Sequence, residues 1–324
     1  MVNTRTDLAL EAHELYRETE RCEHAPGVMV DTDRLDKITV TRVHVENEEG
    51  EKRLGKQKGS YITLEIPELV HKEQATFEDT ITVLADEIKR LVKLEPGAPV
   101  LVVGLGNWHI TADSLGPKVT SSLLVTRHMF ELMPEEIEQG VRPVCALAPG
   151  VLGLTGIETS EIIKGVVQRV KPSLIIAIDS LAARKLSRIS TTIQLTDTGI
   201  TPGAGIGNPR QGLNVSELGV PVIAIGVPTV VDAATMANDT IDQIIDYLSS
   251  QMTEENKFYD TLKNIDREKK YALIKEAQGT EISGLVVTPK EVDEIIEDIS
   301  EIIANAINIA LHEGITIEDL NRYH

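Results

Sequence analysis

The chain has 324 residues, 41% of them hydrophobic and 26% charged, which is typical of a folded globular protein. Its formal net charge of −19 disfavours direct binding to nucleic acid or to an anionic membrane surface, because like charges repel. No run of about 18 apolar residues predicts a membrane span, no secretory signal opens the chain, and the two cysteines form no Cys-x-x-Cys pair. We therefore expect a cytoplasmic protein without a membrane anchor, a zinc ribbon or a redox dithiol.

The first third of the chain combines helical and strand patterns. Residues 4–22 have the apolar spacing of a short amphipathic helix. Residues 36–45 and 59–66 alternate apolar and polar side chains on either side of an acidic stretch, which predicts a long antiparallel hairpin over residues 36–66. Apolar residues then recur every three or four positions over residues 76–94, as they do on one face of a helix.

From residue 99 onward, continuous aliphatic strands alternate with helices. Strands of this kind are buried on both faces, so the pattern predicts an α/β fold with a mostly parallel twisted sheet covered by helices on both faces. The polar residues 251–284 are interpreted as an inserted lobe, and residues 288–291 (TPKE) as a capping box that begins a long apolar helix. The expected strands are 99–106, 142–149, 173–179, 191–197 and 221–228, and the expected helices are 114–130, 158–170 and 231–250.

Gly104 and Gly106 lie at the end of the first of these strands, as glycines do before nucleotide-binding loops. A dinucleotide fingerprint needs a third glycine, but Asn107, Trp108 and His109 come next. No Gly-Lys-Ser or Gly-Lys-Thr completes a phosphate-binding loop either. The sequence therefore predicts no nucleotide cofactor.

Two aspartates lie at the predicted carboxyl edge of the sheet, where open α/β sheets place their sites. Asp179 ends the strand 173–179, and Asp113 follows the strand 99–106 at the start of a helix. Each aspartate alone is equally compatible with a helix N-cap. Together they suggest a pair in which repulsion raises one pKa, so that one carboxyl group holds a proton while the other is ionised. Such a pair can activate water against an amide or, alternatively, hold a divalent metal.

Three other features are weaker signals. Asp197-Thr198-Gly199 is the triplet of pepsin-like proteases, but a single triplet in an α/β chain favours a strand-end turn with glycine at positive φ. The glycine-rich stretch 201–212 is compatible with a lid or cleft lining and equally with a plain loop. His109 lies in the loop after the first buried strand, where a solvent-facing histidine is the simpler interpretation.

Taken together, the sequence resembles the germination protease family of spore-forming bacteria. The resemblance covers nearly the whole chain and includes several long blocks. These blocks are RTDLALEAHE (5–14), GLGNWHITADSLGP (104–117), VTRH (125–128), APGVLGLTGIETSEI (148–162), IIAIDSLAAR (175–184), IQLTDTGITPGAGIGN (193–208) and VIAIGVPTVVDAATM (222–236).

The resemblance implies an endopeptidase that degrades the small acid-soluble proteins coating DNA in dormant spores. It also implies an inactive precursor, a homotetramer, a location in the forespore and spore core, and a fold similar to that of hydrogenase maturation proteases. The two aspartates proposed as catalytic in the family fall on Asp113 and Asp179, and no cofactor or metal is implied. This agrees with the pair inferred from the strand pattern.

The start of the chain resembles a cleavage site in the family's own substrates. Those sites have an acidic residue, a bulky apolar residue and alanine, as in Asp7-Leu8-Ala9. We predict self-processing between Asp7 and Leu8, which makes residues 1–7 a short propeptide and residues 8–324 a single α/β protease domain. The alternative is that Asp7 only caps the first helix.

An acidic residue before the cut requires a basic partner in the site. Arg184 and Lys118 are the cations nearest in sequence to the two aspartates, and His109 and Asp197 are further candidates for substrate contact. Two rival functions stay open: a metal-dependent maturation-type protease, which a chelator would inactivate, and a non-enzymatic acidic protein that binds basic proteins without cutting them.

Overall fold

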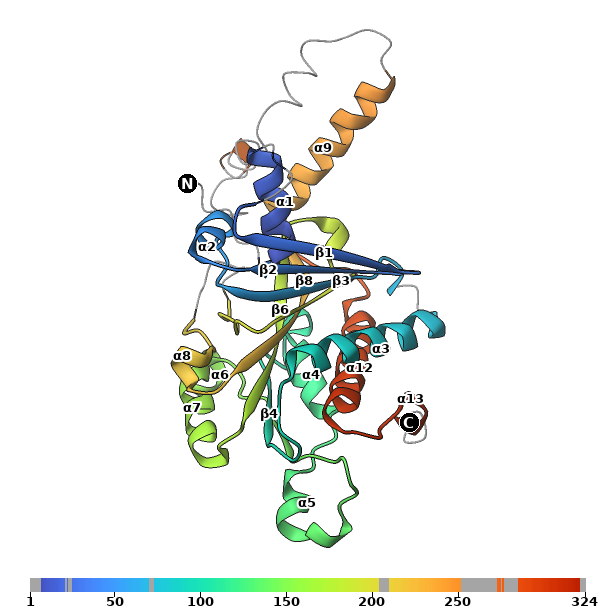
Figure 1. Cartoon of the computed structure of the whole chain (residues 1–324). Helices are drawn as coiled ribbons and strands as arrows, with labels where there is room; N and C mark the ends of the chain where they lie inside the picture. Colours follow the sequence, from blue (N-terminus) through green and yellow to red (C-terminus); the bar gives the residue numbers. More distant parts are fainter. Residues whose placement is uncertain are drawn as a thin grey trace.

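A mixed β-sheet organises the protein in the computed structural model, which describes residues 7–20, 22, 25–69, 73–203, 210–251, 273–274, 276 and 285–320. In this part of the chain the sheet has nine strands in the order β1-β2-β3-β7-β8-β6-β4-β5, with β9 paired to β8 (Figure 1). The strands are β1 (Val28–Leu35), β2 (Ile38–Val45), β3 (Gly59–Glu65), β4 (Val100–Gly104), β5 (Val144–Leu147), β6 (Leu174–Ala183), β7 (Thr192–Thr196), β8 (Val222–Asp232) and β9 (Val286–Val287).

The sheet has a parallel half and an antiparallel half. Strands β8, β6, β4 and β5 run parallel, as their continuous aliphatic sequences predict. Strands β7, β3, β2 and β1 extend the sheet with antiparallel pairs. The α/β class and the N-terminal hairpin are thereby confirmed, with β2 and β3 as the two predicted strands. The sequence reasoning missed β1, which pairs with β2 over its full length.

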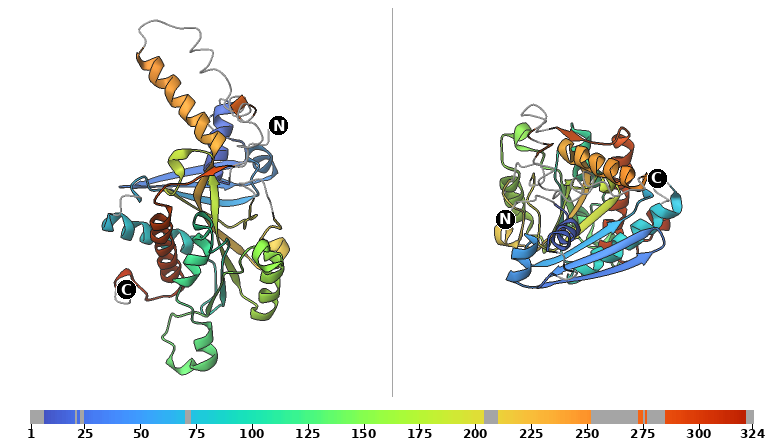
Figure 2. Two further views of the ribbon diagram at one scale, coloured as in Figure 1. Left: turned by 180° about the vertical axis from the view of Figure 1, so that it is seen from behind. Right: turned by 90° about the horizontal axis from the view of Figure 1, so that it is seen from above.

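Helices cover both faces of the sheet, as Figures 1 and 2 show. On one face, α3, α4 and α12 bury the largest apolar cluster, which includes Ile88, Leu115, Ile303, Ile176 and Ile178. On the other face, α7 and α8 pack on Ile175 and Ala177 through a second cluster, and α1 packs on β2 and β3. The helices of these layers are α1 (Ala9–Glu20), α3 (Gln74–Leu91), α4 (Leu115–Ser121), α7 (Thr159–Val170), α8 (Val215–Leu218) and α12 (Val292–Leu311).

The remaining helices are short or lie outside these layers. Helix α9 extends away from the sheet in Figure 1. Most of the predicted inserted lobe, residues 251–284, lies outside the described residues. The bounds are α2 (Glu48–Leu54), η2 (Thr111–Asp113), α5 (Arg127–Leu132), η3 (Pro134–Glu136), α6 (Leu152–Thr155), η4 (Leu186–Arg188), α9 (Ala233–Gln251) and α13 (Ile317–Leu320).

One predicted helix is wrong in its extent. Residues 114–130 form no single helix, because the chain leaves the helical path after Ser121 and resumes it at Arg127. In between, Leu124 N–H donates to the Asn308 side chain, and Thr126 exchanges hydrogen bonds with Val144 on β5. These long-range partners replace the helical hydrogen bonds.

The predicted capping box is also wrong. Helix α12 begins after Glu291, which makes no side-chain cap hydrogen bond. Thr288 instead donates its hydroxyl to the Thr229 carbonyl oxygen at 2.9 Å. The apolar stripe of α12 is nevertheless buried as expected, against α3, α4 and the sheet.

Candidate functional site

Asp179 lies inside a strand rather than at its end, which corrects the sequence-based placement. Strand β6 continues to Ala183 because it keeps pairing with β8, with Asp179 opposite Gly226. The neighbouring parallel strand β4 ends at Gly104, opposite Ile178, so Asp179 is the first residue of β6 beyond that strand. Asp179 is 7% exposed and accepts a hydrogen bond from Ser180 N–H at 2.9 Å. It caps no helix.

Asp113 is the last residue of η2, which follows the loop after β4. Its backbone oxygen accepts from Asn107 N–H at 2.8 Å, and Gly106, at φ 115°, passes so close that a Cβ there would lie 2.1 Å from the same oxygen. Thr229 on β8 donates its hydroxyl to the Ala112 carbonyl oxygen at 2.6 Å. Gly106 therefore allows a close backbone approach that positions Asp113.

Three carboxyl groups interact at this end of β6. Burial raises the pKa of Asp179 well above its usual range, and the negative charges of Asp113 and Asp7 raise it further. Burial also raises the pKa of Asp113 to about 6, although a hydrogen bond from the Asn107 backbone lowers it in part. Burial raises the pKa of Asp7 too, although the hydrogen bond from Ala182 N–H and the charge of Lys56 lower it in part. The structure thus brings the two predicted aspartates together and adds Asp7.

The chain around Asp7 is tightly held. The Asp7 carboxylate accepts a hydrogen bond from Ala182 N–H at 3.2 Å, so it bonds to β6. Its backbone oxygen accepts from Lys56 Nζ at 2.9 Å and from Gln194 Nε2 at 3.1 Å. Leu8 is 0% exposed, and α1 begins at the next residue. The Asp7 side chain therefore has a hydrogen-bond partner on β6, outside α1.

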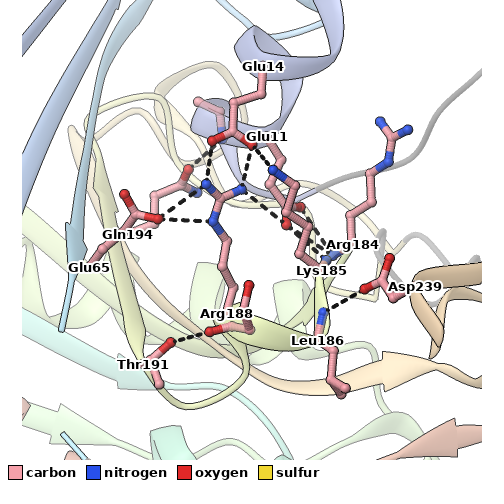
Figure 3. A network of polar contacts seen from close by, with 12 residues as sticks. Glu11, Glu14, Glu65, Arg184, Lys185, Leu186, Arg188, Thr191, Gln194 and Asp239 are labelled. Atoms are coloured by element: carbon pink, nitrogen blue, oxygen red, sulfur yellow. Dashed lines mark hydrogen bonds and ion pairs between the residues drawn. The ribbon is translucent and has the colours of Figure 1, made fainter. Parts of the chain in front are cut away.

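A buried arginine anchors α1 against the sheet (Figure 3). Arg188, which is 5% exposed, contacts the carboxylates of Glu14 at 2.6 Å, Glu65 at 3.2 Å and Glu11 at 3.4 Å. Glu11 also accepts from the backbone N–H groups of Arg184 and Lys185 at 3.2 Å each. The helix that follows the predicted cleavage point is therefore fixed by charge-assisted hydrogen bonds.

The other predicted site residues lie in separate places. Lys118 forms an ion pair with Glu297 on α12, and His109 lies exposed in the loop after β4. Asp197 accepts from Ser60 N–H at 2.8 Å in the turn after β7, where Gly199 has φ 81°. The strand-end turn is thereby confirmed. The backbone of Arg184 contacts Glu11, and Figure 3 shows its side chain pointing away from the Arg188 cluster.

Sequence reasoning missed Lys56, Gln194 and Arg188, whose contacts cross the fold. Gln194, for example, binds Ala9 N–H, 185 residues away, at 2.6 Å. The one available signal was a glutamine inside the aliphatic strand IQLT, which is a polar residue at a buried position.

The described residues contain neither a metal-binding cluster nor a membrane-spanning helix. No group of three or more His, Cys, Asp or Glu side chains among them is arranged to hold a metal ion. Among the described helices, none combines the length and the apolar character needed to cross a membrane.

Known proteins resemble this chain over its full length. The sequence profile of the family described as germination protease matches residues 9–265 and 258–324. A germination protease of Clostridium acetobutylicum is 54% identical, covering 100% of this chain and 99% of the relative. Those of Clostridium tetani and Bacillus mycoides are 50% and 40% identical, covering 99% of this chain and 99% and 97% of the relatives. The chain therefore belongs to the germination protease family and is a peptidase.

Proposed function

We propose that this peptidase is an endopeptidase that uses Asp113 and Asp179 to hydrolyse peptide bonds after an acidic residue. The observation that carries the proposal is the interaction of the buried Asp179 with the partly buried Asp113, both with raised pKa values, beside the chain segment Asp7-Leu8. This segment has the expected acidic and apolar residues on the two sides of a cut. We further propose that the chain is a precursor that removes residues 1–7 by cleaving itself there.

The two aspartates have different roles in the proposed reaction. Asp113, with a pKa of about 6, is ionised near neutral pH and takes the proton of the attacking water as a general base. Asp179 keeps its proton because burial and two neighbouring carboxylates oppose its ionisation. A protonated carboxyl group can donate a hydrogen bond to the carbonyl oxygen of the scissile bond or a proton to the leaving nitrogen.

The resemblance to the family supports proposals for the substrate, the assembly and the location. The proposed substrates are small acid-soluble spore proteins, cut during germination, and the proposed setting is the forespore and spore core. The protein is proposed to work as a homotetramer without a cofactor. Membership in a peptidase family favours cleavage over simple sequestration of basic proteins.

Incubation of the purified full-length chain tests the proposal directly. Intact-mass measurement over time should show a product that begins at Leu8, and a spore protein added to this product should be cut after acidic residues. A new N-terminus at any other residue contradicts the processing site. A spore protein that stays intact but bound supports the rival binding function, and activity lost with chelator and restored by one metal supports the metal-dependent rival.

The rate of self-processing should rise as pH increases through about 6, because Asp113 must lose its proton to act as a base. It should fall again at higher pH, when Asp179 loses the proton it holds. Initial rates measured at constant ionic strength from about pH 4 to about pH 9 check this. The apparent pKa values from the rate profile belong to the pair Asp113 and Asp179 as a whole. A rate that is highest below about pH 5 and falls through pH 6 would contradict the assignment of Asp113 as base.

A further inference from the structure

The carbonyl oxygen of Asp7 is held by two side-chain donors. Lys56 Nζ lies 2.9 Å from it and Gln194 Nε2 lies 3.1 Å from it. The orientation of the Gln194 amide is determined by its second contact, because Ala9 N–H can only donate and therefore needs the oxygen Oε1, 2.6 Å away. The amide nitrogen of Gln194 consequently faces the carbonyl group of the predicted scissile bond.

This arrangement has the form of an oxyanion hole. A carbonyl oxygen has two lone pairs, and here one lysine and one amide donor satisfy both. Hydrolysis of an amide develops negative charge on that oxygen, and donors already in place at about 3 Å stabilise the charge without rearrangement. Both donors, moreover, lie beside a buried bond, where electrostatic interactions are less screened than in water.

Burial and two neighbouring carboxylates act on the charge of Lys56 in opposite directions. Burial lowers the pKa of Lys56, and the nearby carboxylates of Asp7 and Glu11 oppose that effect. Lys56 comes from the loop between α2 and β3 and reaches the start of α1. One cation therefore lies close to both the carbonyl oxygen and the carboxylate of the residue before the predicted cut.

Gln194 and Asp179 share one face of the sheet. Gln194 lies opposite Gly226 on β8, and Gly226 lies opposite Asp179 on β6. Ile193 and Ile178, which precede Gln194 and Asp179 in their strands, belong to the apolar cluster on the face covered by α3 and α12. Because successive side chains of a strand point to opposite faces, Gln194 and Asp179 lie on the other face of the sheet. Two strand spacings, about 10 Å, separate their backbones.

We propose that Lys56 and Gln194 are catalytic residues that stabilise the oxyanion formed when the Asp7–Leu8 bond is hydrolysed. The inference rests on the proposed self-processing and deepens it. The oxygen of a water molecule bonds to the carbonyl carbon of Asp7, its proton passes to Asp113, and the carbonyl electron pair moves onto the oxygen held by Lys56 and Gln194. The C–N bond then breaks, and the nitrogen of Leu8 takes the proton of Asp179. The products are a carboxyl group on Asp7 and an amine on Leu8.

The test compares self-processing of the full-length chain with that of Lys56→Met, using intact mass over time. Loss of an oxyanion donor should slow formation of the Leu8 terminus by about 10²–10³-fold. Lys58→Met is the matched control, because Lys58 lies exposed two residues away, and its rate should stay within about twofold of the original chain. A Lys56→Met rate within about threefold of the original chain overturns the inference.

Two further variants decide the matter if Lys56→Met does not fold, as judged by circular dichroism. Lys56→Gln keeps a donor without the charge, and Gln194→Ala removes the second donor. Each should slow processing by at least about tenfold, and original rates in both overturn the inference. An original chain that never yields the Leu8 terminus contradicts the proposed function itself, whereas normal processing of both the original chain and Lys56→Met contradicts only the roles assigned here.

Discussion

Replacement of Asp179 by asparagine should lower the rate of self-processing by about 10²–10⁴-fold, and Asp113→Asn should do the same, because each removes one half of an acid–base pair. The amide has the size of the carboxyl group but neither holds nor accepts the transferred proton. The measurement is the rate at which the Leu8 terminus forms, followed by intact mass. Asp79→Asn, an exposed position on α3, is the control and should leave the rate unchanged.

The stability of Asp179→Asn separates catalysis from folding. The pKa of Asp179 is raised in the folded protein, so the folded state binds more protons than the unfolded state and stability falls as pH rises from about 4 through the folded pKa. A neutral amide avoids that loss. The variant should therefore be inactive yet at least as resistant to urea as the original chain at neutral pH. Full activity in either variant would reject the role of that aspartate.

Arg188→Met should destabilise the protein by about 3–5 kcal/mol, because it removes the cation shared by the buried Glu11 and the partly buried Glu14 and Glu65. Arg188 is the shared partner of Glu11, Glu14 and Glu65, and its side chain is almost wholly buried. Urea denaturation measures the loss. Arg127→Met removes a surface ion pair with Glu131 within α5 and is the control, with an expected cost below about 1 kcal/mol. Equal costs for the two variants would contradict the anchoring role of Arg188.

The Arg188 cluster should also weaken in acid. Burial raises the pKa of Glu14, but hydrogen bonds from Arg188 and Lys185 outweigh it and leave the pKa below its usual range. Stabilisation of this kind is present above the pKa of an unfolded glutamate and is lost as pH falls through the folded value. Because the cluster fixes α1, and with it the chain at Asp7, we expect Arg188→Met to slow self-processing as well.

Local patterns predicted most of the fold. Continuous aliphatic segments identified β4, β6 and β8, and alternation identified β2 and β3, because each pattern follows from which faces of a strand are buried. The exposed strand β1 was missed, since its partners lie on one side only and its burial pattern carries no alternation. The helix predicted over residues 114–130 failed because Asn308 and Val144, far away in sequence, bind the chain in its middle.

The sequence by itself predicted most of the elements, the pair Asp113 and Asp179 and the acidic and apolar residues at the predicted cut, because apolar patterning and local spacing encode them. Only the tertiary structure decided that Asp179 lies within its strand and that β7 runs antiparallel beside β8. It alone brought Lys56 and Gln194 to the carbonyl oxygen of Asp7. These contacts join segments that are distant along the chain, and each depends on how the sheet and α1 pack, which no local spacing records.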